Sequence, residues 1–222
     1  MLDASSGTRV RLPILLAIAC GLRRGEILPA RWSDLDWLGR TLRISRSLEE
    51  TKAGIRFKEP KTRRGYLSIA VPPFALEILK DHRRAQHELK ERLGSDYQDQ
   101  DLICCAENGE IWKPSAFTSA YRDLLRRRKL NGPNFHALRH SHASHLLRAG
   151  VDVKLISHRL GHSRTAFTLD TYAHILPGQD AEAARRVEKS YQSVRNADPD
   201  HSVSKALAND LAPGRKQPIR VS

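Results

Sequence analysis

The chain has 222 residues, of which 40% are apolar and 28% charged, so it has the composition of a globular protein and is long enough to bury a core. Its 38 Lys and Arg against 25 Asp and Glu give a formal net charge of +13 at pH 7, which favours a polyanionic partner such as nucleic acid or an acidic membrane surface. The three cysteines, two of them adjacent, exclude a disulfide-stabilised scaffold and indicate a reducing intracellular compartment.

Two helices are predicted at the start of the chain. The first runs from about Arg9 to Cys20 and contains Pro13 in its first turns. Its apolar run is too short to cross a bilayer and continues into charged sequence, which favours a buried helix over a secretion signal. The second helix is short and is predicted from near Arg24 to Ala30.

Three short strands are predicted next. Residues 41–48 alternate apolar and polar side chains, which is typical of a half-buried strand. Residues 55–57 and 66–71 are predicted as two further strands, and the basic stretch between them predicts a hairpin with Lys61 near its tip. We therefore expect one small three-stranded antiparallel sheet.

The rest of the chain is predicted to be helical up to a terminal tail. Helices are expected at residues 74–93, 114–129, 135–148, 153–160, 165–175 and 179–194. Residues 196–222 are rich in Pro, Asp and Ser without periodicity and are predicted to be disordered. This tail has four Lys or Arg against three Asp, so most of the positive charge lies on the folded part. The predicted fold class is α+β, mainly α.

One predicted helix carries a group of histidines and an arginine. His136 and Arg139 are three residues apart and so share a helix face. A guanidinium binds phosphate as a planar fork, and a neighbouring imidazole can move a proton near neutral pH. His140, His142 and His145 follow, and we expect them to be core or supporting residues. The spacing of His136 and His140 also fits a zinc site, although the Glu of an HExxH motif is missing.

Two other segments carry residues suited to phosphate chemistry. Gly161 permits a tight turn, and His162 begins the helix predicted after it, where backbone donors to an anion gather. Tyr172 lies ten residues after His162 and is either a nucleophile or a packed aromatic side chain. Near the start of the chain, Arg23 precedes Glu26 by three residues, which also suits a structural ion pair. Each pattern is ordinary when taken alone.

Taken together, these motifs resemble the tyrosine recombinase (phage integrase) family from about residue 5 to residue 195. The strings that carry the resemblance are GLRRGEIL, RWSDLDW, PKTRRGYLSIAVP, HALRHSHASHLLRAGVDVKLISHRLGHS and TLDTYAHILPG. The resemblance implies a catalytic core like that of the tyrosine recombinases and type IB topoisomerases over residues 1–195. It also implies a catalytic set made of Arg23, Lys61, His136, Arg139, His162 and Tyr172, with Glu26 and His140 supporting it.

The resemblance implies site-specific DNA cleavage and rejoining without a metal or a cofactor. Tyr172 would attack a phosphate to form a 3′-phosphotyrosyl link, and Lys61 would protonate the leaving 5′-hydroxyl. The cations would stabilise charge on the non-bridging oxygens. The partner would be double-stranded DNA. The protein would be a monomer when free and would assemble into a tetramer on DNA. It would act in the bacterial cytoplasm and not at a membrane. The helix at about residues 179–195 would dock on a neighbouring protomer or pack on its own domain.

The length of the chain leaves more than one function open. Members of the family usually carry a separate N-terminal DNA-binding domain, which we expect to be absent because the chain begins about twenty residues before Arg23. The chain is then either a catalytic domain or a DNA-binding remnant without productive recombination. A type IB topoisomerase-like nicking and resealing enzyme, or a zinc hydrolase built on His136 and His140, would also be compatible with these residues.

Overall fold

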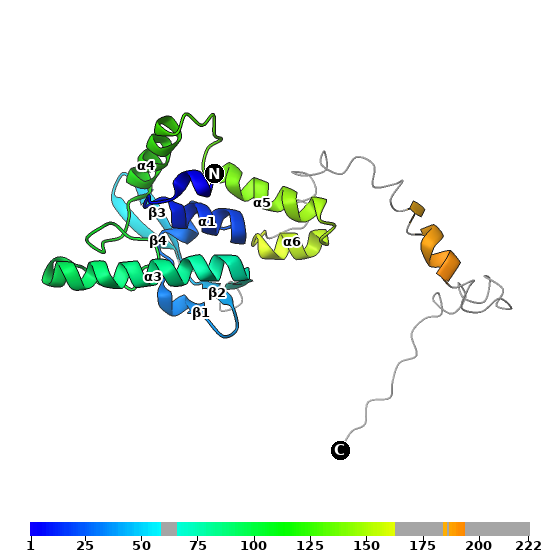
Figure 1. The fold of residues 1–222 in the computed structure, drawn as a ribbon, viewed down its shortest axis with the longest axis horizontal. Helices are drawn as coiled ribbons and strands as arrows, with labels where there is room; N and C mark the ends of the chain where they lie inside the picture. The colour runs from blue at the N-terminus through cyan, green and yellow to red at the C-terminus, as the bar shows by residue number, and fades with distance from the viewer. Residues whose placement is uncertain (59–65, 163–183, 186, 194–222) are drawn as a thin grey trace, which may run out of the picture. The chain divides into compact units, whose positions relative to one another are not determined.

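The computed structural model describes residues 1–58, 66–162, 184–185 and 187–193 (Figure 1). The chain divides into two compact units, Met1–Ile175 and Leu176–Ser222. In the second unit the described residues are helical, within the last helix predicted from the sequence. The predicted helix at 165–175 and the predicted tail at 196–222 lie outside the described residues.

The helices of the first unit lie where the sequence predicts them, to within a few residues. They are α1 (Arg11–Cys20), α2 (Arg24–Ile27), α3 (Pro73–Leu93), α4 (Pro114–Arg127), α5 (His136–Arg148) and α6 (Val153–Arg159). Short 3-10 helices at Asp3–Ser5, Trp32–Asp34 and Gly94–Asp96 lie in the connections. In Figure 1, α6 turns back alongside α5 at the end of the described part of this unit.

Local sequence explains where these helices begin and end. Pro73 and Pro114 occupy the first position of α3 and α4, where a missing N–H is not needed. Asp152 caps α6, because its carboxylate accepts the N–H groups of Lys154 and Leu155 at 2.8 and 3.2 Å. Gly21 ends α1 with a φ of 71°, a left-handed conformation that favours glycine.

The strands form two small antiparallel sheets. The first contains β1 (Leu35–Asp36), β2 (Thr41–Ile44) and β5 (Leu67–Ala70), in the order β1-β2-β5. The second is the hairpin of β3 (Ser47–Thr51) and β4 (Gly54–Lys58). The mainly helical α+β class is confirmed, with a three-stranded sheet and an additional hairpin.

Two details of the strand prediction are wrong. The strand predicted at 41–48 is two strands in different sheets, because the chain leaves the first sheet at Ser45 and Arg46. The Arg46 side chain donates from Nε and Nη2 to the Pro29 carbonyl oxygen at 2.9 and 2.7 Å. The predicted hairpin of 55–57 with 66–71 is not formed either, since β4 pairs with β3 and β5 pairs with β2. Lys61 falls between β4 and β5, outside the described residues.

The core is centred on α1, which contacts α2, α3 and α5. This helix is apolar on nearly every side, and Leu15, Leu16 and Ala17 are fully buried. A cluster of Phe117, Tyr121 and Phe135 joins α4 to the start of α5, with ring centroids 4.8 to 6.5 Å apart. Because α1 packs against three other helices, the position at which the following loop begins is fixed. None of the described helices has both the length and the apolar composition needed to cross a membrane.

Candidate active site

Arg23 stands at the start of α2 and is held there by Glu26. Its backbone N–H and its Nη1 each donate to a Glu26 carboxylate oxygen at 2.8 Å. Gly25 lets α2 approach β3 closely, because a Cβ at this position would lie 2.7 Å from the Leu48 carbonyl oxygen. The Arg23 side chain still exposes 41% of its surface, so it is both fixed in place and open to an anion.

Arg139 projects from α5 and is 4% exposed. Its Nη1 donates to the Gly21 carbonyl oxygen at 2.5 Å, and its Nη2 donates to the Leu160 carbonyl oxygen. Nη2 also lies 3.1 Å from Nε2 of His162. The guanidinium therefore joins the loop after α1 to the turn after α6.

The Glu26 carboxylate lies beside both guanidiniums. Its Oε1 accepts from Arg23 at 2.8 Å, and its Oε2 is 4.0 Å from Nη1 of Arg139. The sequence predicts a supporting role for Glu26 beside Arg23, and the structure adds the proximity to Arg139. One half-buried carboxylate next to two cations fixes their geometry while leaving the site positively charged.

His162 is held as a neutral imidazole. An arginine can only donate, so Nε2 of His162 must accept from Arg139, and the proton of the neutral ring then sits on Nδ1. Burial, together with Arg139 and Arg23, lowers the pKa of His162 to about 4. The ring is thus uncharged at pH 7 and can offer its Nδ1–H as a donor.

His136 begins α5 and is exposed. Its ring meets that of His140 edge to face, with centroids 4.8 Å apart. Partial desolvation of the ring by its neighbours, together with His140 and Arg139, lowers the pKa of His136 below its ordinary value, so this imidazole is also mainly neutral at pH 7 and able to accept a proton. Among the described side chains, no group of three or more His, Cys, Asp or Glu is arranged to hold a metal ion.

A cavity of about 380 Å³ opens beside Arg23 and His136. It is lined by Leu22, Arg23, Arg24, Gly25, Thr118, Asn134, Phe135 and His136. Arg24 is fixed in its wall, because Nη1 donates to Thr118 Oγ1 at 2.6 Å. The cavity therefore presents cationic and neutral hydrogen-bonding groups from α2, α4 and α5 to one space.

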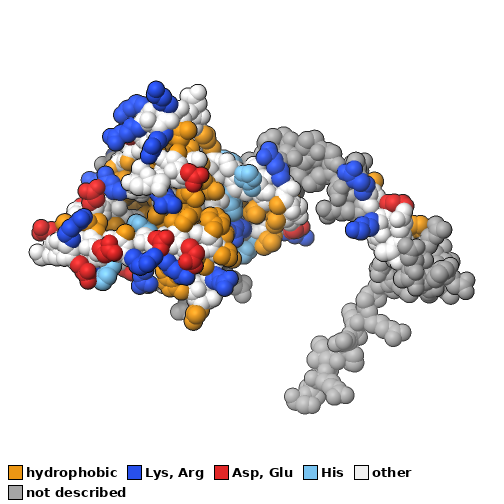
Figure 2. Space-filling view, in the orientation of Figure 1, with side chains coloured by type: hydrophobic (Ala, Val, Ile, Leu, Met, Phe, Trp, Pro, Cys, Tyr) orange, Lys and Arg blue, Asp and Glu red, His pale blue; other side chains and the backbone are white. Residues whose placement is uncertain are grey.

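Exposed cations also gather over α4, as Figure 2 shows. We call this the α4 basic cluster, made of Arg122, Arg126, Arg127, Arg128 and Lys129, which are all exposed. Asp123 pairs with Arg126 at 2.9 Å and offsets one of these charges. The remaining charge suits a polyanion that extends beyond the cavity.

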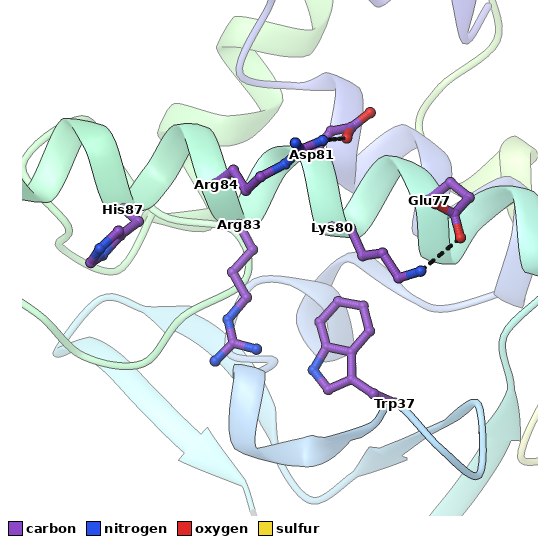
Figure 3. A pocket seen from close by; sticks show the side chains of 7 residues that line it. All are labelled: Trp37, Glu77, Lys80, Asp81, Arg83, Arg84 and His87. Carbon is purple, nitrogen blue, oxygen red and sulfur yellow. Dashed lines mark hydrogen bonds and ion pairs between the residues drawn. The ribbon is translucent and has the colours of Figure 1, made fainter.

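A larger hollow of about 620 Å³ lies over α3, and none of the predicted site residues that the structure describes is among its lining residues (Figure 3). Several of its charges are paired with one another: Lys80 bonds Glu77 at 2.8 Å, and Arg84 bonds Asp81. Arg83 lies over the ring of Trp37, 5.8 Å from its centroid. Because these contacts satisfy the lining residues locally, the hollow does not resemble a catalytic site.

The structure brings six predicted site residues together. They are Arg23, Glu26, His136, Arg139, His140 and His162, which come from α2, α5 and the turn after α6. Lys61 and Tyr172 lie outside the described residues, and their roles stay predictions. His142 is buried, as expected of a core residue, whereas His145 is exposed and so is not a core residue. Sequence reasoning also missed Arg159, which makes three side-chain bonds near this site.

Residues 1–178 match the phage integrase family. A tyrosine recombinase XerC-like protein from Caldanaerobacter subterraneus subsp. tengcongensis is 32% identical over 193 residues, which cover 82% of this chain and 49% of that protein. Transposase A from transposon Tn554 of Staphylococcus aureus is 32% identical over 179 residues, which cover 79% of this chain and 46% of the transposase. The chain spans about half the length of these curated relatives.

Solved structures share the fold. The Tn1549 transposon integrase, in complex with transposon right end DNA, matches with a TM-score of 0.69 at 20% identity, covering 84% of this chain and 62% of that one. The catalytic domain of bacteriophage HP1 integrase matches with a TM-score of 0.51 at 16% identity, covering 83% of this chain and 87% of that domain.

Proposed function

The chain belongs to the phage integrase family, and we propose that it is the catalytic domain of a site-specific DNA recombinase. The observation that carries the proposal is the arrangement of two guanidiniums and two neutral imidazoles around the Glu26 carboxylate. A phosphodiester gains negative charge on its non-bridging oxygens as it becomes pentacoordinate. Preorganised donors of this kind stabilise that charge.

In the proposed reaction, the phenolic oxygen of Tyr172 forms a bond to phosphorus while the bond from phosphorus to the 5′-oxygen breaks. The Tyr172 proton passes to the neutral His136, and Lys61 gives a proton to the leaving 5′-oxygen. The products are a 3′-phosphotyrosyl link and a free 5′-hydroxyl. Because one phosphodiester replaces another, no oxidant, nucleotide or cofactor is consumed, and a 5′-hydroxyl from another strand can reverse the step.

The two arginines differ in what they can do at the phosphate. Arg23 is partly exposed and borders the cavity, so it is suited to binding a non-bridging oxygen directly. Arg139 is nearly buried and bonds two carbonyl oxygens, so in this proposal it contributes charge and also fixes the turn that carries His162. His162 then offers its Nδ1–H as a further donor.

We propose double-stranded DNA as the substrate, with the α4 basic cluster binding phosphates beyond the cleavage site. Such binding should weaken steeply as salt is raised. Four chains would assemble on DNA from free monomers, and the helix at about 179–195 would dock on a neighbouring protomer. We further propose residues 1–195 as the catalytic domain, 196–222 as a tail, and the bacterial cytoplasm as the location.

The proposal is tested with nicked suicide duplexes whose sequence around the nick is randomised, because the target site is unknown. We expect a covalent protein–DNA adduct that resists denaturant, forms in the presence of a chelator and is lost in Tyr172→Phe. Tyr66→Phe is the matched control, since it removes the hydroxyl of an exposed tyrosine that has no proposed role. An adduct that persists in Tyr172→Phe, or no adduct with any duplex, would contradict the proposal.

A further inference from the structure

A second arginine, Arg159 at the end of α6, ties four elements together. Its Nε donates to Nε2 of His142 on α5 at 3.1 Å. Its Nη2 donates to the carbonyl oxygen of Ala19 on α1 at 3.1 Å and to that of Ala70 on β5 at 2.9 Å. One side chain therefore joins α6 to α5, which carries site residues, to the end of α1, which leads into the loop before Arg23, and to strand β5.

His142 completes this connection and must be neutral to do so. It is buried, and its Nδ1 lies 2.7 Å from the Ile18 carbonyl oxygen. Because Arg159 can only donate, Nε2 accepts and Nδ1–H donates to Ile18. Burial, then the nearby Arg159 and Arg139, lowers the pKa of His142 to about 4.

The charged and titratable groups around this pair come from three helices. Arg159 lies on α6, Arg139 and His145 lie on α5, and the Cys20 thiol at the end of α1 faces Arg159. Burial raises the pKa of Cys20 to about 12, so this thiol carries no charge at pH 7. None of the described side chains around this pair is an anion, so a protonated His142 would lose its bond from Arg159 without gaining an ion pair.

His142 and Arg159 lie next to the two segments that carry site residues, the loop after α1 and the turn after α6. A Cβ on Gly21 would come within 2.6 Å of His142 Cδ2, so His142 packs against the loop that leads to Arg23. Leu160, the residue after Arg159, accepts from Arg139 and begins the turn that leads to His162. The loop after α1 and the turn after α6 are therefore each held both by Arg139 and by the pair of His142 and Arg159.

We propose that His142 and Arg159 act as positioning residues, which set Arg23 and His162 for the phosphate without touching it. The inference rests on the proposed recombinase function. Neither residue lines the cavity beside Arg23, and His142 is buried. Their effect would pass through Gly21 and Leu160, the two residues whose carbonyl oxygens also bind Arg139.

The first test compares Arg159→Met with Lys154→Met, which removes an exposed cation from the same helix. We expect Arg159→Met to lower the rate constant of single-turnover adduct formation by on the order of 10²-fold, because small displacements of catalytic groups have effects of that size. The adduct yield and the Kd for DNA should stay within about twofold of wild type, and Lys154→Met should leave all three unchanged. A lower yield with an unchanged rate constant would indicate a purely structural role and overturn the inference.

The second test replaces His142 in two ways. His142→Gln keeps an acceptor for Arg159 and a donor for Ile18, so we expect most of the rate to be retained. His142→Phe keeps a planar ring but removes both nitrogens, and should match Arg159→Met. Combining His142→Phe with Arg159→Met should cause little further loss, because the two residues act as a unit. Equal rates for the Gln and Phe variants would contradict the inference.

A third test does not depend on activity. The ring protons of His162 are titrated by NMR in wild type, Arg159→Met and Lys154→Met. If Arg159 holds the turn, Arg159→Met should raise the pKa of His162 toward its ordinary range, whereas Lys154→Met should not. An unchanged His162 titration in Arg159→Met overturns the inference even if wild type cleaves DNA. If His162 shifts as expected but wild type forms no adduct, the positioning of the His162 turn by Arg159 stands and the proposed function fails.

Discussion

Replacing Gly21 with alanine tests whether the loop after α1 is packed as tightly as the structure shows. Gly21 has a φ of 71°, and a Cβ there would lie 2.6 Å from His142 and 3.0 Å from Leu160. Gly7 has the same φ of 71° but nothing within 4 Å of the added Cβ. Gly7→Ala therefore reports the cost of the backbone conformation, and the difference between the two variants reports the packing.

The structure gives the expected size of each effect. A left-handed conformation costs a non-glycine residue about 1–2 kcal/mol. Overpacking in a filled core adds about 1–3 kcal/mol, so Gly21→Ala should lose about 2–5 kcal/mol of unfolding free energy in total. At about 2–4 °C per kcal/mol for a chain of this size, the Tm should fall by about 10 °C in Gly21→Ala and by about 4 °C in Gly7→Ala.

Thermal and urea unfolding followed by circular dichroism measure both variants against wild type. We also expect Gly21→Ala to slow adduct formation at temperatures where it is folded, because the new methyl group displaces His142 or the loop that carries Arg23. Gly7→Ala should cleave DNA normally. Equal losses of stability in the two variants would refute the packing argument for Gly21.

Three further predictions concern stability and reactivity. The Cys20 thiol, whose pKa burial raises to about 12, should resist alkylation at pH 8 in the native protein and react only in denaturant; rapid native labelling would contradict its burial. Asp152→Ala removes the cap of α6 and should cost about 1 kcal/mol of unfolding free energy, measured in urea, whereas Asp152→Asn should retain most of it. His142 and His162 have pKa values of about 4 in the folded state, below their ordinary 6.5, so the unfolded chain binds more protons between these values. The contribution of these two histidines to the unfolding free energy should therefore be complete above pH 6.5 and decrease as the pH drops toward 4, with a shallower slope in His142→Gln. An unfolding free energy that does not change over this pH range would contradict the assignment of His142 and His162 as neutral.

The helices could be predicted from the sequence because their signals are local. Apolar spacing and the prolines at the starts of α3 and α4 place these helices to within about two residues. The strands were harder, because residues 41–48 keep their alternation across a point where the chain changes sheets. The bonds that divert it, from Arg46 to Pro29 and from Ser45 to Asp34, join residues that no local pattern relates.

For the site, too, the sequence predicts which residues take part but not the long-range contacts that they make. The motifs identify Arg23, His136, Arg139 and His162, because their residue types and order are characteristic. They do not show that Arg139 is buried or that it bonds the carbonyl oxygens of Gly21 and Leu160. Arg159 gave no signal, since an arginine in the last turn of a helix is also explained by the helix dipole.

Peptide mass spectrometry of the trapped adduct tests most directly whether Tyr172 becomes covalently bound to DNA. Trypsin should release residues 165–185 as one peptide, in which Tyr172 is the only tyrosine. After nuclease digestion, we predict that this peptide carries a nucleotide joined through its 3′-phosphate to Tyr172, and that Tyr172→Phe yields none. A nucleotide attached to another residue, or a link through a 5′-phosphate, would contradict the account.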